Sequence, residues 1–126
     1  MNIPENLRYS KDHEWARAEG DLIEVGITDY AQDALGDVVY VELPEIDSRL
    51  QQHEVFGEVE STKSVSELYA PVSGTVSEVN DDLYGAPQRL NEDPYGEGWI
   101  CKINCENSDE LDNLLDANAY RQLISE

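Results

Sequence analysis

The sequence predicts a mainly β protein built from two small packed antiparallel sheets, with one short internal helix and C-terminal helices. Two observations carry this prediction. Over roughly the first hundred positions, short apolar runs are separated by turn residues, and none keeps a helical period for long. Later in the chain, the leucines take up a helical spacing. Several short strands followed by helices are typical of two packed sheets with a helical flank.

Residues 14–27 have the pattern of a β-hairpin with its turn at Gly20. Ile23, Val25 and Ile27 occupy alternate positions along the second strand. Because successive side chains of a strand point to opposite faces, these three side chains should lie on one face. We expect that face to be buried.

The next segment, TDYAQDALGDVVYVELP, predicts a short helix followed by a strand. Thr28 can cap the helix through its side-chain oxygen, and Gly36 can end it. In the strand, Val39, Val41 and Leu43 alternate with the residues between them. The final proline ends the strand because it has no backbone N–H to donate.

A second hairpin is predicted around the only lysine or arginine that lies between Arg49 and Arg89. Strand patterns at residues 54–61 and 65–79 flank this lysine, Lys63, which falls between the two strands. The turn is too polar to enter a core easily. Lys63 should therefore project into solvent from the tip of the hairpin.

One more strand is predicted at residues 99–103, within the run WICKINC. In an extended chain Cys101 and Cys105 would be about 13 Å apart, roughly twice the distance that a disulfide spans. We expect two free thiols. A metal site is not expected, because His13 and His53 show no spacing that would complete one with the cysteines.

Helices are predicted beyond this strand. Ser108 can cap the first of them, and apolar residues keep a helical spacing almost to the end of the chain. A length of 126 residues with 40% hydrophobic composition suits one small core. We expect a single domain over residues 1–126, with its β core at about 15–103 and a helical flank at about 108–124.

The charge and hydropathy of the chain exclude two classes of partner. It has 28 acidic and 8 basic side chains, a formal charge of −20, whereas nucleic-acid binding depends on lysine and arginine. No run of about 18 apolar residues could span a membrane, and the first residues lack the apolar core of a signal peptide. We expect a cytoplasmic monomer whose partners are proteins.

Lys63 is better suited to attachment than to catalysis. A nucleophilic or Schiff-base lysine needs a pKa lowered by burial or by a neighbouring cation. The neighbours of Lys63 in the sequence, Glu60 and Glu67, are anionic and favour its charged ammonium form instead. A lysine on a rigid hairpin tip can carry a long flexible cofactor to other proteins. The pattern of residues names neither the cofactor nor the chemistry.

Five blocks of the sequence resemble those of one family, in that family's order, and together they cover most of the chain. They are YSKDHEW, GITDYAQDALGDVVYVELPE, GEVESTKSVSELYAPVSGTVSEVN, NEDPYGEGWICKI and LLDANAY. The combination of ESxK with APVSG is fairly specific, and the other blocks make it more so. The chain resembles the H proteins of the glycine cleavage system, which belong to the lipoyl carrier proteins.

The resemblance implies the barrel-sandwich hybrid fold of lipoyl and biotinyl domains, and a lipoate joined to Lys63 by an amide bond after the action of a lipoylating enzyme. It implies a shuttle without an active site. A pyridoxal-phosphate glycine decarboxylase would load an aminomethyl group. An aminomethyltransferase would pass the one-carbon unit to tetrahydrofolate, and dihydrolipoyl dehydrogenase would reoxidise the dithiol with FAD and NAD.

Such a shuttle must protect its hydrolysable cargo, and a surface cleft that receives the loaded arm is the simplest means. The amine of the cargo would pair with an acid there. Glu14 and Glu67 are our candidates, although ordinary solvated carboxylates are as good an explanation of both residues. His13 lies close to a tryptophan in the sequence, Trp15, and is expected to be a packing residue.

Three other classes of protein could use the same residues. Biotin carriers usually flank their lysine with methionines, whereas Thr62 and Ser64 stand here. An autonomous enzyme that uses Cys101, Cys105 or Lys63 directly is disfavoured by the expected burial of the thiols and the acidic surroundings of the lysine. A lipoate-relay or moonlighting paralogue, which donates lipoyl groups to other carrier domains, would use the same lysine and stays open.

Overall fold

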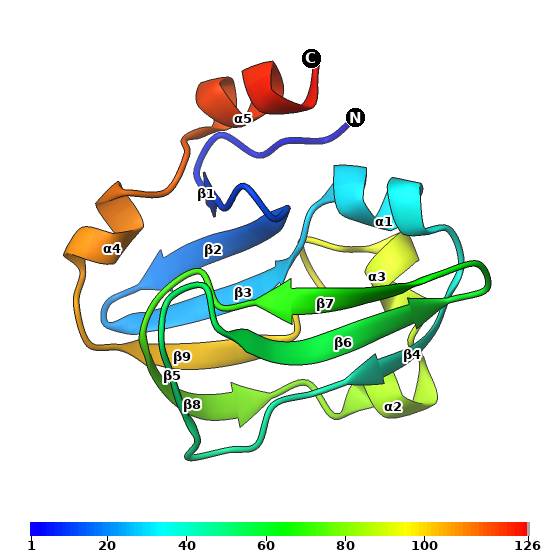
Figure 1. The fold of residues 1–126 in the computed structure, drawn as a ribbon, viewed down its shortest axis with the longest axis horizontal. Helices are drawn as coiled ribbons and strands as arrows, with labels where there is room; N and C mark the ends of the chain where they lie inside the picture. The colour runs from blue at the N-terminus through cyan, green and yellow to red at the C-terminus, as the bar shows by residue number, and fades with distance from the viewer. Residues whose placement is uncertain (126) are drawn as a thin grey trace.

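The computed structural model describes residues 1–125 and confirms a mainly β fold with two antiparallel sheets. The larger sheet has the strand order β1-β2-β3-β9-β8-β5, and the smaller has the order β4-β6-β7, lying across it in Figure 1. The strands are β1 (Arg8–Tyr9), β2 (Glu14–Glu19), β3 (Leu22–Ile27), β4 (Val38–Glu42), β5 (Arg49–Leu50), β6 (Val55–Ser61), β7 (Val65–Tyr69), β8 (Gly74–Val79) and β9 (Cys101–Cys105).

Short helices occupy the connections and the C-terminal part of the described chain. They are α1 (Asp29–Leu35), α2 (Asp82–Gly85), α3 (Arg89–Glu92), α4 (Asp109–Asp112) and α5 (Ala117–Ile124). The sequence predicted α1 and the two C-terminal helices but missed α2 and α3. A four-residue helix is too short to show a period, and each of these two is fixed by one buried leucine, Leu83 or Leu90.

The predicted caps are correct for α1 and wrong for α4. The Thr28 side chain accepts a hydrogen bond from the Ala31 N–H, and Gly36 ends the helix with φ of 82°. Ser108 makes no side-chain cap, because its own backbone is already helical. The C-terminal helix that has a side-chain cap is α5, where Asp116 accepts from a backbone N–H.

The main core lies between the two sheets. Ile23, Val25 and Ile27 are at most 3% exposed, which confirms the predicted buried face of β3. A second cluster joins the N-terminal segment to α5 and contains Trp15 and the stacked rings of Tyr9 and Tyr120. Figure 1 shows the N-terminal segment running beside α5. The C-terminal helix is thereby packed against β1 and β2, close to the start of α1.

The simple alternation predicted for β4 is wrong. Val41 and Leu43 are buried, but Val39 is 52% exposed. The register of β4 against β6 shifts between Val38 and Tyr40, so Val39 is an extra residue that interrupts the alternation. The side chains of Val39 and Tyr40 are consequently both exposed to solvent.

Two further features concern the cysteines and the lengths of the helices. Cys101 is buried, Cys105 is half-buried, and both are free cysteines. Among residues 1–125, the longest helix has eight residues, and no helix is long and apolar enough to cross a membrane.

Candidate functional site

Lys63 lies in the tight turn between β6 and β7, at the end of the hairpin that extends to the right in Figure 1. The Ser61 N–H donates to the Ser64 carbonyl at 2.8 Å. The Ser61 hydroxyl oxygen accepts from the backbone N–H groups of Lys63 at 3.3 Å and Ser64 at 3.0 Å. The turn thus satisfies its own backbone donors, and the lysine is exposed, as predicted.

The turn is tied to the loop that follows α1. The Thr62 N–H donates to the Asp37 carbonyl at 3.1 Å. The Asn91 amide holds the same loop from α3, donating to the Gly36 carbonyl at 2.8 Å and accepting from the Val38 N–H at 2.9 Å. Because both sides of this loop are bonded, the lysine turn has a fixed position relative to α1.

The side chain of Lys63 lies against Gly36. A β-carbon built on Gly36 would be 3.3 Å from Cε of Lys63 and 3.8 Å from its Nζ. Gly36 has φ of 82° and ψ of −157°, a region of the backbone map that is essentially restricted to glycine. Glycine therefore both ends α1 and leaves room for the stem of the lysine.

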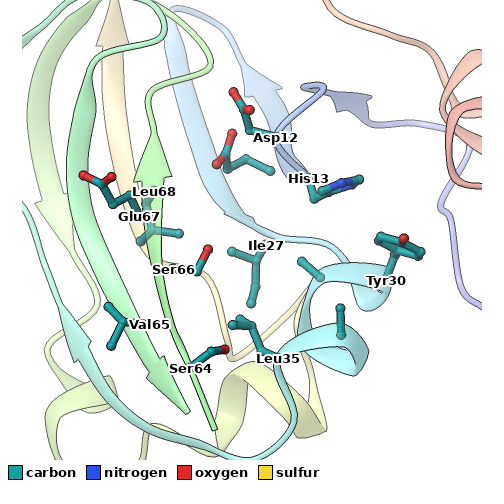
Figure 2. A pocket seen from close by; sticks show the side chains of 13 residues that line it. Asp12, His13, Ile27, Tyr30, Leu35, Ser64, Val65, Ser66, Glu67 and Leu68 are labelled. Atoms are coloured by element: carbon teal, nitrogen blue, oxygen red, sulfur yellow. The ribbon is translucent and has the colours of Figure 1, made fainter.

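A cleft of about 320 Å³ opens beside the lysine turn (Figure 2). Part of its wall comes from α1 and part from β7. It is lined by Asp12, His13, Glu14, Ile27, Tyr30, Ala31, Ala34, Leu35, Ser64, Val65, Ser66, Glu67 and Leu68. Apolar side chains predominate near α1, and carboxylates are found toward β2, so the cleft combines an apolar wall with an acidic end.

Glu14 is one of the acidic residues at that end, and it is only 1% exposed. One carboxyl oxygen accepts from the Ser10 hydroxyl at 2.6 Å, and the other accepts from the Tyr69 N–H at 3.1 Å. Burial raises the pKa of Glu14 to about 8, although both hydrogen bonds oppose this shift. Burial therefore favours the protonated form of Glu14 near neutral pH.

Glu67 is placed differently from Glu14. It lies along the cleft but is exposed, and it pairs with Glu58 on the neighbouring strand. Figure 2 shows its carboxylate on the side of β7 away from Ser66 and Ile27. The structure thus brings one predicted carboxylate into the cleft and leaves the other beside its rim.

The sequence did not single out Asp12, although it lines the same acidic end. Asp12 stands two residues before Glu14 in the block YSKDHEW, and that spacing was the available signal. His13, between them, has φ of 72° and packs against Tyr30 at 4.8 Å between ring centroids. This left-handed residue lies in the turn before β2, where both neighbouring acids line the cleft.

His13 is a packing residue, as expected, and it also joins α5 to the cleft. Its Nδ1 lies 2.8 Å from the Tyr120 hydroxyl, which lies 2.8 Å from the Thr28 hydroxyl. Burial lowers the pKa of His13, so the neutral imidazole is favoured near neutral pH. The side chain supports the wall of the cleft through this hydrogen-bonded chain.

These features suit a flexible acyl arm that ends in an amine. Lys63 has an exposed primary amine of the kind that can form an amide bond, and its stem lies against Gly36 at the end of α1. The apolar lining from Ile27 and Leu35 suits an aliphatic chain, and a buried carboxyl at Glu14 suits a cationic group.

Comparison with known proteins identifies the family. A family model described as Glycine cleavage H-protein matches residues 7–126. A glycine cleavage system H protein of Symbiobacterium thermophilum is 58% identical over 125 residues, which cover 99% of this chain and 98% of the relative. The relative from Mycobacterium tuberculosis strain H37Rv is 57% identical over 132 residues, with 99% and 98% covered.

The chain belongs to the glycine cleavage H-protein family. A crystal structure of a glycine cleavage system H protein from Mycobacterium marinum has a TM-score of 0.90 and 40% identity, covering 98% of this chain and 100% of that chain. The fold is accordingly the barrel-sandwich hybrid that the resemblance implied.

Membership confirms the predicted biochemical class. The protein is a lipoyl carrier of the glycine cleavage system and has no catalytic activity of its own in that system. It carries the aminomethyl group between glycine decarboxylase, aminomethyltransferase and dihydrolipoyl dehydrogenase. H proteins carry their lipoyl group on a lysine.

Proposed function

We propose that Lys63 is the residue that carries the lipoyl group and that the adjoining cleft shelters the loaded arm. The observation that supports this most directly is a single exposed amine on a rigid turn, beside a cleft that contains a buried carboxyl. Lipoate supplies a disulfide that can be reduced and that accepts and releases the one-carbon cargo. The protein supplies attachment, direction and shelter.

Glu14 has the properties needed to receive the amine of the cargo. Its carboxyl is held by Ser10 and Tyr69, so its position does not depend on the cargo. A nearby cation favours the charged carboxylate and lowers the raised pKa. Glu14 would thus release its proton and form a charge-assisted hydrogen bond when a cation enters. Such a pair is strong because the Glu14 carboxyl is buried.

Glu67 has a lesser role in this proposal. Its exposed carboxylate lies at the rim, where solvent screens its charge. It contributes to the acidity of the entrance, whereas Glu14 provides the specific contact.

The compartment is proposed to be the cytoplasm. The two free cysteines fit a reducing environment, and the partner enzymes use the soluble coenzymes NAD and tetrahydrofolate. Oxidation of both thiols in the protein isolated from cells would contradict this assignment.

The site of attachment is tested by mass spectrometry of the protein after incubation with a lipoylating enzyme, lipoate and ATP. One lipoyl group should be added, and peptide fragmentation should place it on Lys63. A label on Lys11 or Lys102 would show that the attachment site has been assigned wrongly.

A further inference from the structure

The outer face of the small sheet has three exposed apolar side chains close to Lys63. Val39 is 52% exposed, Tyr40 is 44% exposed and Val65 is 60% exposed. Val39 and Tyr40 are neighbours on β4, and Val65 lies on β7, across Glu60 of β6. Large apolar side chains exposed next to a functional group indicate a surface that is covered by a partner. We call this surface, made by Val39, Tyr40 and Val65, the Tyr40 face.

The strand register places the Tyr40 face beside the lysine turn. Tyr40 pairs with Glu60, and Glu60 pairs with Val65, so these residues form one row across all three strands. Glu60 precedes Lys63 by three residues and Val65 follows it by two. The extra residue at Val39 adds a second exposed side chain to the β4 end of the row. Bulges of this kind are common where a strand has to present a side chain for function.

A second row carries negative charge. Glu42 pairs with Glu58, and Glu58 pairs with Glu67, which places three carboxylates in register on the same three strands. The strands β4, β6 and β7 contain no lysine or arginine. A partner that covers the Tyr40 face would therefore gain from a basic border next to an apolar centre.

We propose that the Tyr40 face, with its acidic row, is the docking surface for the lipoylating enzyme. The inference rests on the proposed attachment of lipoate to Lys63. Enzymes of the glycine cleavage cycle act at the far end of the completed arm, whereas the lipoylating enzyme acts on the lysine nitrogen itself. That enzyme must bring its active site against the turn, and the Tyr40 face is the apolar surface beside the turn. A second copy of this chain is a poorer occupant, because two chains of charge −20 repel each other.

The reaction at this surface is an acyl transfer without oxidation or reduction. The neutral amine of Lys63 attacks the carbonyl carbon of lipoyl adenylate and forms the C–N bond of the amide. The C–O bond to the phosphate of AMP breaks, AMP leaves with the bonding electron pair, and the proton of the amine passes to solvent. Docking contributes by holding the amine at the acyl carbon.

The apolar part of the surface is tested by comparing two exposed tyrosines. Tyr40→Ala removes the centre of the proposed surface, and Tyr84→Ala removes a side chain that is 54% exposed on α2. The rate of lipoylation is measured with a purified lipoylating enzyme, lipoate and ATP at varied carrier concentration. We expect Tyr40→Ala to raise KM for the carrier about tenfold with kcat nearly unchanged, and Tyr84→Ala to change KM less than about twofold. Equal KM values in the two variants would overturn the proposal.

The acidic row is tested with a charge reversal. Glu42→Lys should raise KM for the carrier about tenfold and reduce its dependence on salt, because it places a cation against the basic border of the enzyme. Glu19→Lys makes the same change of charge at an exposed residue of β2 and controls for the lower net charge. Equal effects of the two reversals would mean that only the total charge matters, and they would exclude a local docking row.

Three controls keep the outcomes separate. Acylation of Lys63 by a small reagent, such as an acetyl ester, should proceed equally in wild type and in Tyr40→Ala; a slower reaction in the variant would trace its effect to the turn and overturn docking. Peptide mapping of the wild type tests the attachment site, so a misplaced lipoyl group contradicts the proposed function rather than the surface. Sedimentation that shows a dimer lost in Tyr40→Ala would assign the face to self-association.

Discussion

The lysine turn and the Glu14 end of the cleft are opposite in nearly every physical property. Lys63 is exposed, and it is held in place through backbone hydrogen bonds of its turn. Glu14 is 1% exposed, and its own carboxyl oxygens are bonded to Ser10 and Tyr69. A residue that carries a flexible arm needs to be accessible and fixed in position. A site that binds the charged end of that arm needs a buried environment, because attraction between charges is stronger where the dielectric constant is low.

The two regions consequently differ in what they contribute to folding. The Lys63 side chain lies on the surface, and its replacement removes little that the fold depends on. Glu14 is a buried carboxyl, which folding favours only in its protonated form because burial penalises the charge. The role proposed for Lys63 can therefore be separated from stability, whereas the role proposed for Glu14 is coupled to it.

The largest expected effect comes from Lys63→Arg. Arginine keeps the positive charge, but its guanidinium cannot act as the acyl acceptor. Lipoylation and exchange of labelled bicarbonate into glycine, measured with glycine decarboxylase, should both be lost completely. The free energy of unfolding should fall by no more than about 0.5 kcal/mol.

The matched control for this change is Lys11→Arg, at another exposed lysine. It should be lipoylated and active. Full bicarbonate exchange by Lys63→Arg would disprove the carrier role of the lysine, and a large loss of stability would disprove the independence of the turn from the core.

A second prediction concerns the dependence of stability on pH at the buried end. The pKa of Glu14 is about 8 in the folded protein and ordinarily 4.5. The folded state therefore keeps a proton that the unfolded chain releases between these values. The stabilisation is complete below about pH 4.5 and is lost as pH rises toward 8.

Comparison with Glu14→Gln isolates this contribution. Relative to the variant, the wild type should lose about 2–3 kcal/mol of stability between pH 5 and pH 7, measured by urea unfolding. Glu19→Gln, at an exposed carboxylate, should follow the wild type. Parallel curves for wild type and Glu14→Gln would mean that the carboxyl is not protonated. The variant should also release its loaded aminomethyl group several times faster.

A smaller effect is expected at Gly36, where the Lys63 side chain lies against the end of α1. Gly36→Ala places a β-carbon 3.3 Å from Cε of Lys63 and forces alanine into a backbone region that suits glycine. The free energy of unfolding should fall by about 1–3 kcal/mol. The Lys63 side chain should move off the loop, which is detectable as a lost proton–proton contact between residues 36 and 63 in NMR spectra.

Gly20→Ala provides the comparison. Gly20 also has a positive φ, of 66°, but a β-carbon there would meet nothing within 4 Å. It should cost about 1 kcal/mol and leave the spectrum of Lys63 unchanged. An unchanged contact between residues 36 and 63 in Gly36→Ala would show that the glycine does not direct the lysine.

The smallest expected effect is that of salt on partner binding. A net charge of −20 favours encounter with basic surfaces, and such attraction is screened beyond about 8 Å at physiological ionic strength. Association rates with glycine decarboxylase should fall severalfold as salt rises, with a much smaller change in dissociation rates. Flat association rates across a salt series would confine recognition to short-range contacts.

Local patterns in the sequence predicted the strands of five or more residues, the first helix and the lysine turn, but not the two-residue strands β1 and β5. Alternation predicted the buried face of β3, on which Ile23 and Val25 are fully buried. Successive side chains of a strand point to opposite faces, so apolar residues at every second position share one face. Thr28 and Gly36 marked the ends of α1 through hydrogen bonds that span only a few residues. Lys63 stood out because it is a lone cation in a polar run between two strand patterns.

The cleft could be predicted only in part. Glu14 and Asp12 lie in one short block, but whether their carboxylates face a cavity depends on the left-handed turn at His13 and on the position of α1. Glu67 met the same chemical criterion as Glu14. It differs because alternation along β7 directs its side chain to the opposite face of the strand.

The sequence by itself determined that Lys63 is a lone amine on an exposed turn, since that is a local property. Tertiary structure alone decided that Val39 is exposed, that the stem of Lys63 lies over Gly36, and that Glu14 has a pKa of about 8. A bulge depends on the register of the neighbouring strand, and desolvation depends on atoms brought together from distant parts of the chain. Neither property is encoded in the spacing of residues along one segment.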